Sequence, residues 1–453
     1  MKHWAHDSVF YHIYPLGLCG AASRNDFCSP VIPRLEQLYG WVDHLQNLGV
    51  NAVWLGPVFE SSAHGYDTAD YFRVDRRLGT NHTLSEVISA LHQRGIRVIL
   101  DAVLNHVGRD FWAFRDVREH NERSAYCDWF QGLNFQMRSP FNDPFTYKGW
   151  NGCYDLVKLN LRNPAVKKHL FQAVEMWIQE FNLDGLRLDA ADCMEIGFLK
   201  ELGSLCRGIR SDFWLMGEVV HGDYRKWANA ETLDSVTNYE CYKGLYSSHV
   251  DRNYFEIAYA LNRQFGEDGL YCEIPLYNFA DNHDVNRVAS NLTNPAHLHT
   301  LYCLLFTMPG VPAIYYGSEW GMQAIKSNGD DKALRPHLDI ATVSGKNPYP
   351  DLSKTIARLA RIRLSSQALK YGDYHQLSVS HEQFAFARQT PEECMVVSVN
   401  ASDKPASFRL AIPAGYGSHL VDLLNPGETF PVINGHARID PVWPCWARIM
   451  VVR

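Results

Sequence analysis

The feature that most constrains the fold of this sequence is a regular alternation between short β-branched runs and amphipathic segments. Between residue 9 and about residue 365, eight runs are typical of buried strands. These runs cover residues 9–14, 50–55, 96–103, 185–189, 213–219, 235–239, 277–280 and 312–316. Eight strands that alternate with helices predict an α/β fold, a (β/α)₈ TIM barrel with a parallel sheet.

The segments between the strands carry helix start and stop signals. Apolar residues in 35–48 recur every three or four positions and stop before Gly49, which is suited to a left-handed helix end. Thr83 is expected to cap a second helix, and Asn163-Pro164 to open a third one. These signals support the alternation of strands and helices.

Two regions depart from this alternation. After the third strand the sequence shows no regular period but many aromatic residues, and a long loop at the C-terminal face of a barrel is usually functional. From about Tyr371 onward, alternating apolar residues between Gly and Pro turns predict an antiparallel β-domain. We therefore expect the first part of the barrel in 1–106, an excursion in 107–160, the rest of the barrel in 161–368 and a C-terminal β-sandwich domain in 369–453.

Composition narrows the possible partners and the compartment. The chain has 43 Lys and Arg against 50 Asp and Glu, without long blocks of one sign, so it offers no basic stripe for nucleic acid. No stretch reaches the about 18 apolar residues that a membrane span needs. Eleven cysteines without Cys-x-x-Cys spacing, and a start without an apolar leader, predict a cytoplasmic protein with free thiols. The oligomeric state stays open.

Ionisable residues stand at the ends of four predicted strands. They are Asp101 and His106, Asp189, Glu218, and His283 with Asp284. A single strand-end Asp commonly caps a loop, but four strands that deliver carboxylates to one rim favour an active site, because like charges repel. Arg187 and Asp189 are two residues apart on a strand, so they share a face, and we expect Arg187 to keep Asp189 ionised.

Paired carboxylates beside an aromatic-rich loop suggest cleavage of a neutral, polyhydroxylated substrate such as a sugar. One carboxylate would attack the anomeric carbon, while the other, kept protonated by nearby negative charge, would donate to the leaving oxygen. Aromatic side chains such as Tyr66 would stack on sugar faces. The alternative for these aromatics is a local hydrophobic cluster under a long loop.

Several motifs resemble those of the α-amylase family of glycoside hydrolases. The family's four best-known segments match DAVLNH (101–106), GLRLDAAD (185–192), GEVV (217–220) and FADNHD (279–284). A fifth, LVKLN (156–160), is similar to the segment typical of the neopullulanase, cyclomaltodextrinase and maltogenic-amylase group. The resemblance implies a retaining α-glucan hydrolase on a TIM barrel.

The resemblance also implies a role for each matching position. Asp189 would be the nucleophile, Glu218 the general acid/base, and Asp284 the carboxylate that holds sugar hydroxyls at the bond being broken. The substrate-binding positions would be Tyr66, Asp67, His106, Arg187, His221, His283 and Arg335.

Two departures from the family pattern limit what the resemblance implies. The extra N-terminal β-domain of the neopullulanase group is not expected, because the first strand begins by residue 9. Asn105 matches one calcium-binding position, but Asp192-Cys193 stands where typical α-amylases have Lys-His. We therefore expect no obligatory metal and no cofactor.

Other functions remain open at this point. The main hypothesis is a hydrolase of maltodextrins or cyclodextrins with an α-glucan oligosaccharide as its partner, but a 4-α-glucanotransferase or an α-glucosidase could use the same covalent intermediate. An inactive glucan-binding or transporter-partner protein should have lost a carboxylate. A metal-dependent barrel hydrolase would want a His-x-His pair, and the first strand offers only His12.

Overall fold

The fold is built around a parallel barrel. The computed structural model describes residues 3–327, 331–343 and 349–453. Eight strands form one sheet in the order β11-β10-β9-β5-β2-β1-β13-β12, and a parallel bridge between Thr237 and Tyr277 joins its two edges. The strands are β1 (Phe10–Ile13), β2 (Ala52–Leu55), β5 (Arg97–Ala102), β9 (Gly185–Leu188), β10 (Trp214–Gly217), β11 (Ser235–Val236), β12 (Tyr277–Phe279) and β13 (Val311–Tyr315). The predicted TIM barrel is confirmed, with one strand in each expected run.

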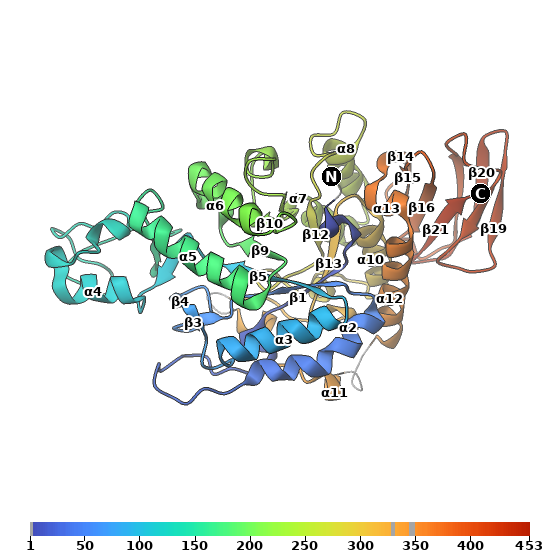
Figure 1. The fold of residues 1–453 in the computed structure, drawn as a ribbon. Coiled ribbons are helices and arrows are strands. Elements are labelled where there is room, and N and C mark those ends of the chain that lie inside the picture. The colour runs from blue at the N-terminus through green and yellow to red at the C-terminus, as the bar shows by residue number, and fades with distance from the viewer. Residues whose placement is uncertain (1–2, 328–330, 344–348) are drawn as a thin grey trace.

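Helices surround the barrel (Figure 1). The longer ones are α2 (Val42–Leu48), α3 (Asn81–Gln93), α5 (Pro164–Phe181), α6 (Ile196–Ile209), α7 (Tyr239–Val250), α8 (Phe255–Phe265), α10 (His297–Thr307) and α12 (Pro350–Ser365). Shorter ones are α1 (Pro15–Leu18), α9 (Val288–Asn291), α11 (Ile340–Val343) and α13 (Gln367–Tyr371). In the described part of the chain, no helix combines the length and the apolar character that crossing a membrane requires.

The ends of three helices can be compared with the start and stop signals expected from the sequence. Gly49 ends α2 with φ of 85°, as predicted. The segment before α2 is a 3-10 helix, Arg34–Trp41, so the expected single helix is divided. The expected cap at Thr83 is wrong, because the Thr80 hydroxyl accepts the Thr83 N–H at 3.2 Å and Thr83 completes a capping box. At α5, Asn163 caps the helix as predicted.

The excursion after β5 is more ordered than the sequence suggested. Strands β6 (His106–Gly108), β8 (Cys153–Lys158) and β7 (Gly149–Trp150) form a small antiparallel sheet, while β3 (Phe59–Ser61) and β4 (Thr68–Val74) pair as a hairpin after β2. The expectation of no regular period is wrong, because α4 (Trp112–His120) buries Ala113, Phe114 and Val117 on one face.

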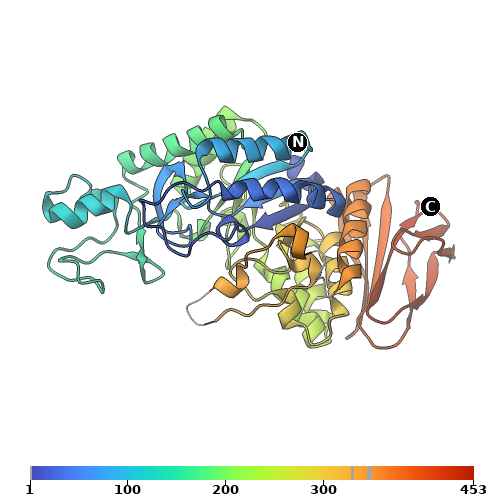
Figure 2. The ribbon, with the colours of Figure 1, turned by 90° about the horizontal axis from the view of Figure 1, so that it is seen from below.

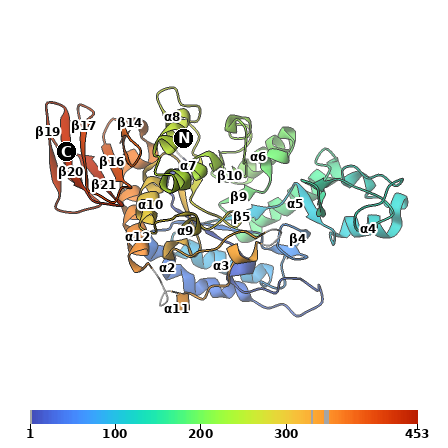
Figure 3. The same ribbon diagram turned by 180° about the vertical axis from the view of Figure 1, so that it is seen from behind.

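Aromatic rings form the interior of the excursion. The Phe114 ring lies 5.1 Å from that of Phe130, 6.1 Å from that of Phe145 and 4.9 Å from that of Tyr147. The Arg109 guanidinium also pairs with Asp143 at 2.8 Å. The excursion therefore has a buried aromatic cluster that is continuous with the barrel core. The excursion projects from the barrel opposite to the C-terminal strands (Figure 1, Figure 3).

The C-terminal strands form the predicted antiparallel β-domain. They lie in the order β14-β15-β16-β21-β18-β19-β20-β17. Their bounds are β14 (Asp373–Val379), β15 (Gln383–Gln389), β16 (Cys394–Asn400), β17 (Ala406–Ala411), β18 (His419–Asp422), β19 (Thr429–Ile433), β20 (His436–Val442) and β21 (Trp446–Val452). Helices α10 and α12 lie between the barrel and this domain (Figure 1, Figure 2). Buried side chains of both parts, such as Leu301 and Ile449, belong to one continuous core.

Candidate active site

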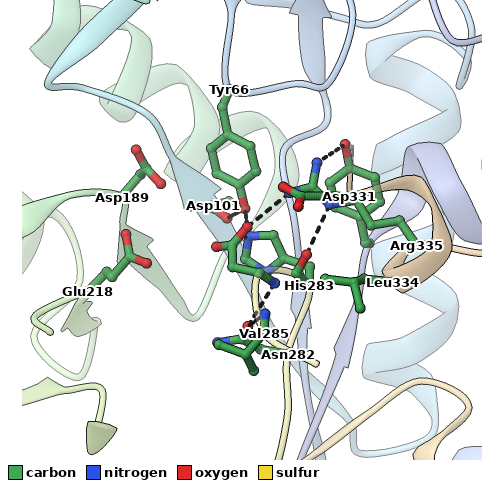
Figure 4. A network of polar contacts seen from close by, with 12 residues as sticks. Tyr66, Asp101, Asp189, Glu218, Asn282, His283, Val285, Asp331, Leu334 and Arg335 are labelled. Atoms are coloured by element: carbon green, nitrogen blue, oxygen red, sulfur yellow. Dashed lines mark hydrogen bonds and ion pairs between the residues drawn. The ribbon is translucent and has the colours of Figure 1, made fainter. Parts of the chain in front are cut away.

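Carboxylates from four strands meet at the C-terminal end of the barrel. Asp101 lies on β5, while Asp189, Glu218 and Asp284 lie on the segments that follow β9, β10 and β12. Figure 4 shows Asp189 and Glu218 beside each other, facing a second group that contains Tyr66 and Arg335. This is the face at which barrel enzymes carry their active sites.

The Arg187 guanidinium is the centre of the first group. One of its terminal nitrogens, Nη1, lies 2.8 Å from Asp101 Oδ1 and 2.9 Å from Asp189 Oδ1. The other, Nη2, lies 3.0 Å from Glu218 Oε2. The Ala190 N–H also donates to Glu218 Oε2 at 3.0 Å. A single buried cation therefore holds three carboxyl groups.

The single guanidinium of Arg187 does not offset the effect of burial on three carboxyl groups, because the pKa values of all three are raised. Burial raises the pKa of Asp189 and that of Glu218 to about 7, although Arg187 lowers both. Burial raises the pKa of Asp101 to about 6 against the same guanidinium. The expectation that Arg187 keeps Asp189 ionised is therefore corrected. The ion pair exists and lowers the pKa of Asp189, but burial outweighs it and the net shift of that pKa is upward.

The second group surrounds Asp284. Its carboxylate lies 2.9 Å from His283 Nε2 and 2.9 Å from Arg335 Nη2. Burial opposes ionisation of Asp284, but His283 and Arg335 bring its pKa below the usual range. The Tyr66 hydroxyl donates to Asp101 at 3.0 Å and also contacts His283 Nε2, so it links the two groups.

Two further predicted residues lie close to these groups. Asp67 Oδ1 accepts the N–H groups of His64 and Gly65, each at 3.1 Å, and so fixes the turn that carries Tyr66. His106 Nε2 lies 3.7 Å from Asp189 Oδ2, too far for a hydrogen bond. Burial lowers the pKa of His106 to about 3, so this ring is neutral beside Asp189.

Nine of the ten predicted site residues lie in these two groups or directly beside them, and the tenth is His221. His221 lies exposed on the loop after Glu218. Two other residues belong to the network although they were not among the predicted site residues. Asp101 pairs with Arg187, and the ring of Tyr14 lies 4.7 Å from the Arg335 guanidinium. The strand-end position of Asp101 was a signal for it, whereas nothing local marked Tyr14.

A cavity of about 350 Å³ is lined by Arg335, whose guanidinium pairs with Asp284. Its lining includes Tyr14, His64, Asp331, Lys332 and Arg335. Asp331 Oδ2 also lies 3.1 Å from Arg335 Nη2. This size is in the range of small-molecule binding sites, and charged and aromatic groups line one side of it.

The residues around Asn105 fit a calcium ion poorly. Asn105 Oδ1 is buried without a hydrogen-bond partner, but the ammonium group of Lys158 lies on the neighbouring strand and donates to the Cys193 carbonyl at 3.0 Å. Calcium needs six to eight oxygen ligands. Among the described residues, no three His, Cys, Asp or Glu side chains are grouped as metal ligands. His12, the first-strand histidine considered for a metal-dependent hydrolase, is buried and its ring stacks on that of Trp54.

The fold and this site define a class of protein. A TIM barrel with buried carboxyl groups at its C-terminal face, of which three have raised pKa values and one a lowered pKa, is equipped for acid–base and nucleophilic catalysis. Residues 35–349 match the family described as alpha amylase, catalytic domain. The chain belongs to this family of glycoside hydrolases.

Known relatives agree with this assignment. A cyclomaltodextrinase from a Bacillus species is 30% identical over 421 residues, which cover 88% of this chain and 73% of the relative. A solved cyclomaltodextrinase structure aligns with a TM-score of 0.87 and 27% identity, covering 99% of this chain and 78% of that chain. The ligand-free cyclic alpha-maltosyl-(1→6)-maltose hydrolase from Arthrobacter globiformis has a TM-score of 0.81 and 26% identity, covering 99% of each chain.

Proposed function

We propose that this enzyme is a retaining glycoside hydrolase that cleaves α-1,4-glucosidic bonds in maltodextrins or cyclodextrins. The observation that carries the proposal is the shared anchor of Asp189 and Glu218, which lie 2.9 and 3.0 Å from the two terminal nitrogens of Arg187. Retaining enzymes place their carboxyl groups about 5 to 5.5 Å apart, because no water has to fit between them. A common guanidinium anchor favours this close spacing.

The proposed reaction has two steps. In the first, Asp189 attacks the anomeric carbon, the glycosidic C–O bond breaks, and Glu218 gives its proton to the leaving oxygen. In the second, Glu218 takes a proton from water, whose oxygen replaces Asp189 on the anomeric carbon. Burial raises the pKa of Glu218 to about 7, which suits a group that donates and takes up a proton in turn.

The second group of residues is suited to hold the sugar. Asp284 is an ionised acceptor for hydroxyl groups, and Arg335 and His283 are donors close to it. The cavity lined by Arg335 also carries the Tyr14 ring. The relatives named for cyclomaltodextrin hydrolysis support a short or cyclic α-glucan as the substrate.

We also propose a reducing compartment, the cytoplasm, as the place of action. All eleven cysteines lie in the described residues, and all are free thiols. Free thiols in such number are typical of proteins kept in a reducing environment. Survival of activity after treatment with an oxidant would argue against a need for reduced thiols.

The anomeric form of the first product tests the mechanism. Proton NMR of maltotriose cleavage should show the α-anomer first, because two displacements retain the configuration. An initial β-anomer would contradict the proposal.

A product time course from maltohexaose, pullulan and β-cyclodextrin tests the reaction type. We expect shorter maltodextrins from maltohexaose and opening of the cyclodextrin. Products longer than the substrate would identify a glucanotransferase, and release of glucose alone would identify an α-glucosidase. Absence of turnover with retained binding would identify an inactive glucan-binding protein.

A further inference from the structure

One lysine connects the excursion to the segment that carries the proposed nucleophile. Lys158 ends β8 and lies opposite His106 in the small sheet of the excursion. The neighbouring Leu159 N–H donates to the Asn105 carbonyl at 3.1 Å, so the backbone around Lys158 is tied to the end of β5. From this position its Nζ donates to the Cys193 carbonyl at 3.0 Å. Lys158 thus bridges two segments that the sequence keeps 35 residues apart.

Cys193 ends the turn on which both proposed catalytic groups depend. The Cys193 N–H donates to the Ala190 carbonyl at 3.0 Å and closes this turn, residues 190–193. Ala190 has φ of 47°, a left-handed conformation that costs energy for a residue other than glycine. Its N–H holds Glu218 Oε2, and Asp189 directly precedes it. A shift of this turn would move Asp189 and Glu218 relative to each other.

Lys158 also brings a positive charge to the segment next to Asn105, the residue that matches a calcium-binding position, because the following residue, Leu159, bonds the Asn105 carbonyl. Asn105 Oδ1 is buried without a hydrogen-bond partner. The next residue, His106, lies opposite Lys158 on β8, and Lys158 is a cation rather than an oxygen ligand. A fixed positive charge repels a divalent ion, and the Cys193 carbonyl already accepts a hydrogen bond. The Cys193 carbonyl is therefore bonded by a group of the chain itself.

We propose that Lys158 is a positioning residue whose ammonium group, in place of a metal ion, holds the turn of residues 190–193 in its catalytic geometry. This inference rests on the proposed roles of Asp189 and Glu218. It explains why a sequence that keeps Asn105 lacks grouped carboxylate ligands around it in the described residues.

The first test replaces Lys158 by Met, which keeps most of the side chain and removes the charge. We expect kcat on maltotriose to fall between about 10-fold and 100-fold with KM nearly unchanged, because small displacements of catalytic groups are costly to rate. Lys158→Arg should restore most of the rate. Lys148→Met changes an exposed lysine of the same excursion and should have no effect. Equal kcat in Lys158→Met and the wild type would overturn the proposal.

A pH profile separates positioning from a general structural role. The groups that set the pKa of Glu218 are Arg187, Asp189, Asp284 and the Ala190 N–H, which favours the ionised form. If the turn loosens, this hydrogen bond weakens and the pKa of Glu218 rises. The alkaline limb of kcat/KM in Lys158→Met should therefore move to higher pH. An unchanged limb together with a lower kcat would show that the lysine does not act through the turn.

A second test measures bound metal and thermal stability, and it does not depend on enzyme activity. Elemental analysis of the purified wild type should find substoichiometric calcium, and neither EDTA nor CaCl₂ should shift its Tm. Bound calcium at one per chain, or a lower Tm in EDTA, would overturn the inference while leaving the proposed hydrolase function intact. Conversely, an active Asp189→Asn variant would refute the proposed function and leave the metal result standing.

Discussion

At the scale of single residues, the pKa values of the carboxyl groups in the site depend on how many cationic side chains contact each of them. One guanidinium, that of Arg187, contacts Asp101, Asp189 and Glu218, whereas Asp284 contacts both Arg335, which it shares with Asp331, and His283. Burial therefore raises the pKa values around Arg187, while the pKa of Asp284 stays low. Carboxyl groups that are neighbours in space are thus given different protonation states, which acid–base chemistry requires.

The first prediction concerns the nucleophile. Asp189→Asn should lower kcat on the order of 10³-fold or more, because an amide cannot form the glycosyl intermediate. Substrate affinity, measured as the Kd of maltotriose by calorimetry, should change little, since Asp284 and Arg335 remain. Asp268→Asn, an exposed position, serves as the control. A variant within about tenfold of the wild-type rate would remove Asp189 from this role.

The second prediction is the pH dependence. Turnover needs one proton on the Asp189–Glu218 pair, and each pKa is raised to about 7. Mutual repulsion separates the two titrations, so kcat/KM should decline on both sides of neutral pH. With an activated aryl glycoside, whose leaving group needs no proton, Glu218→Gln should lose the alkaline limb. If that limb persists in Glu218→Gln, another residue is the acid.

At the scale of elements, the excursion is a small folding unit attached to the barrel. Helix α4 contributes Phe114, which is buried among three other aromatic rings. The sheet of β6, β7 and β8 links this cluster to Asn105 and His106 at the end of β5. Packing in the excursion therefore affects residues near the proposed nucleophile.

The third prediction tests this packing. Phe114→Ala should destabilise the protein by about 3 to 5 kcal/mol, because it leaves a cavity in a buried aromatic cluster. Thermal unfolding measures the loss, and limited proteolysis should show cleavage within 107–160. Phe141→Ala is the matched control, since Phe141 is 47% exposed and contacts mainly Arg109, and it should cost about 1 kcal/mol or less. Equal losses in both variants would show that the buried aromatic cluster around Phe114 does not stabilise the excursion.

At the scale of the whole molecule, the barrel and the C-terminal domain share one core. Leu301 and Leu305 of α10 belong to the same buried cluster as Val397 and Ile449 of the β-domain. Arg388 of β15 is buried and donates to the Thr307 carbonyl at the end of α10 at 2.9 Å. The two parts are therefore joined by apolar contacts and by buried hydrogen bonds.

The fourth prediction follows from this shared core. Calorimetry should show a single unfolding transition, with equal calorimetric and van't Hoff enthalpies, because one buried face of the β-domain belongs to the same apolar cluster as the barrel and would be exposed if either part unfolded alone. A fragment of residues 1–368 would expose the apolar face of α10 and should lack a cooperative transition. Two separate transitions in the full chain would show that the domains are independent.

The sequence by itself determined the architecture of this molecule and most of the residues of its site. The eight strand runs, the left-handed end at Gly49 and the cap at Asn163 are local signals, since hydrophobic period and turn chemistry act over a few residues. Residues at strand ends must meet at one rim once the strands close into a barrel, which is why Asp189, Glu218 and Asp284 could be grouped in advance.

Only the tertiary structure decided how these residues act on one another. That Arg187 serves three carboxyl groups, that Asp101 is 86 residues away from its partner Arg187, and that Lys158 reaches Cys193 are contacts between distant segments. The exposed position of His221 likewise depends on the course of a loop. The physical reason is that a pKa depends on burial and on neighbouring charges, and both exist only after the chain has folded.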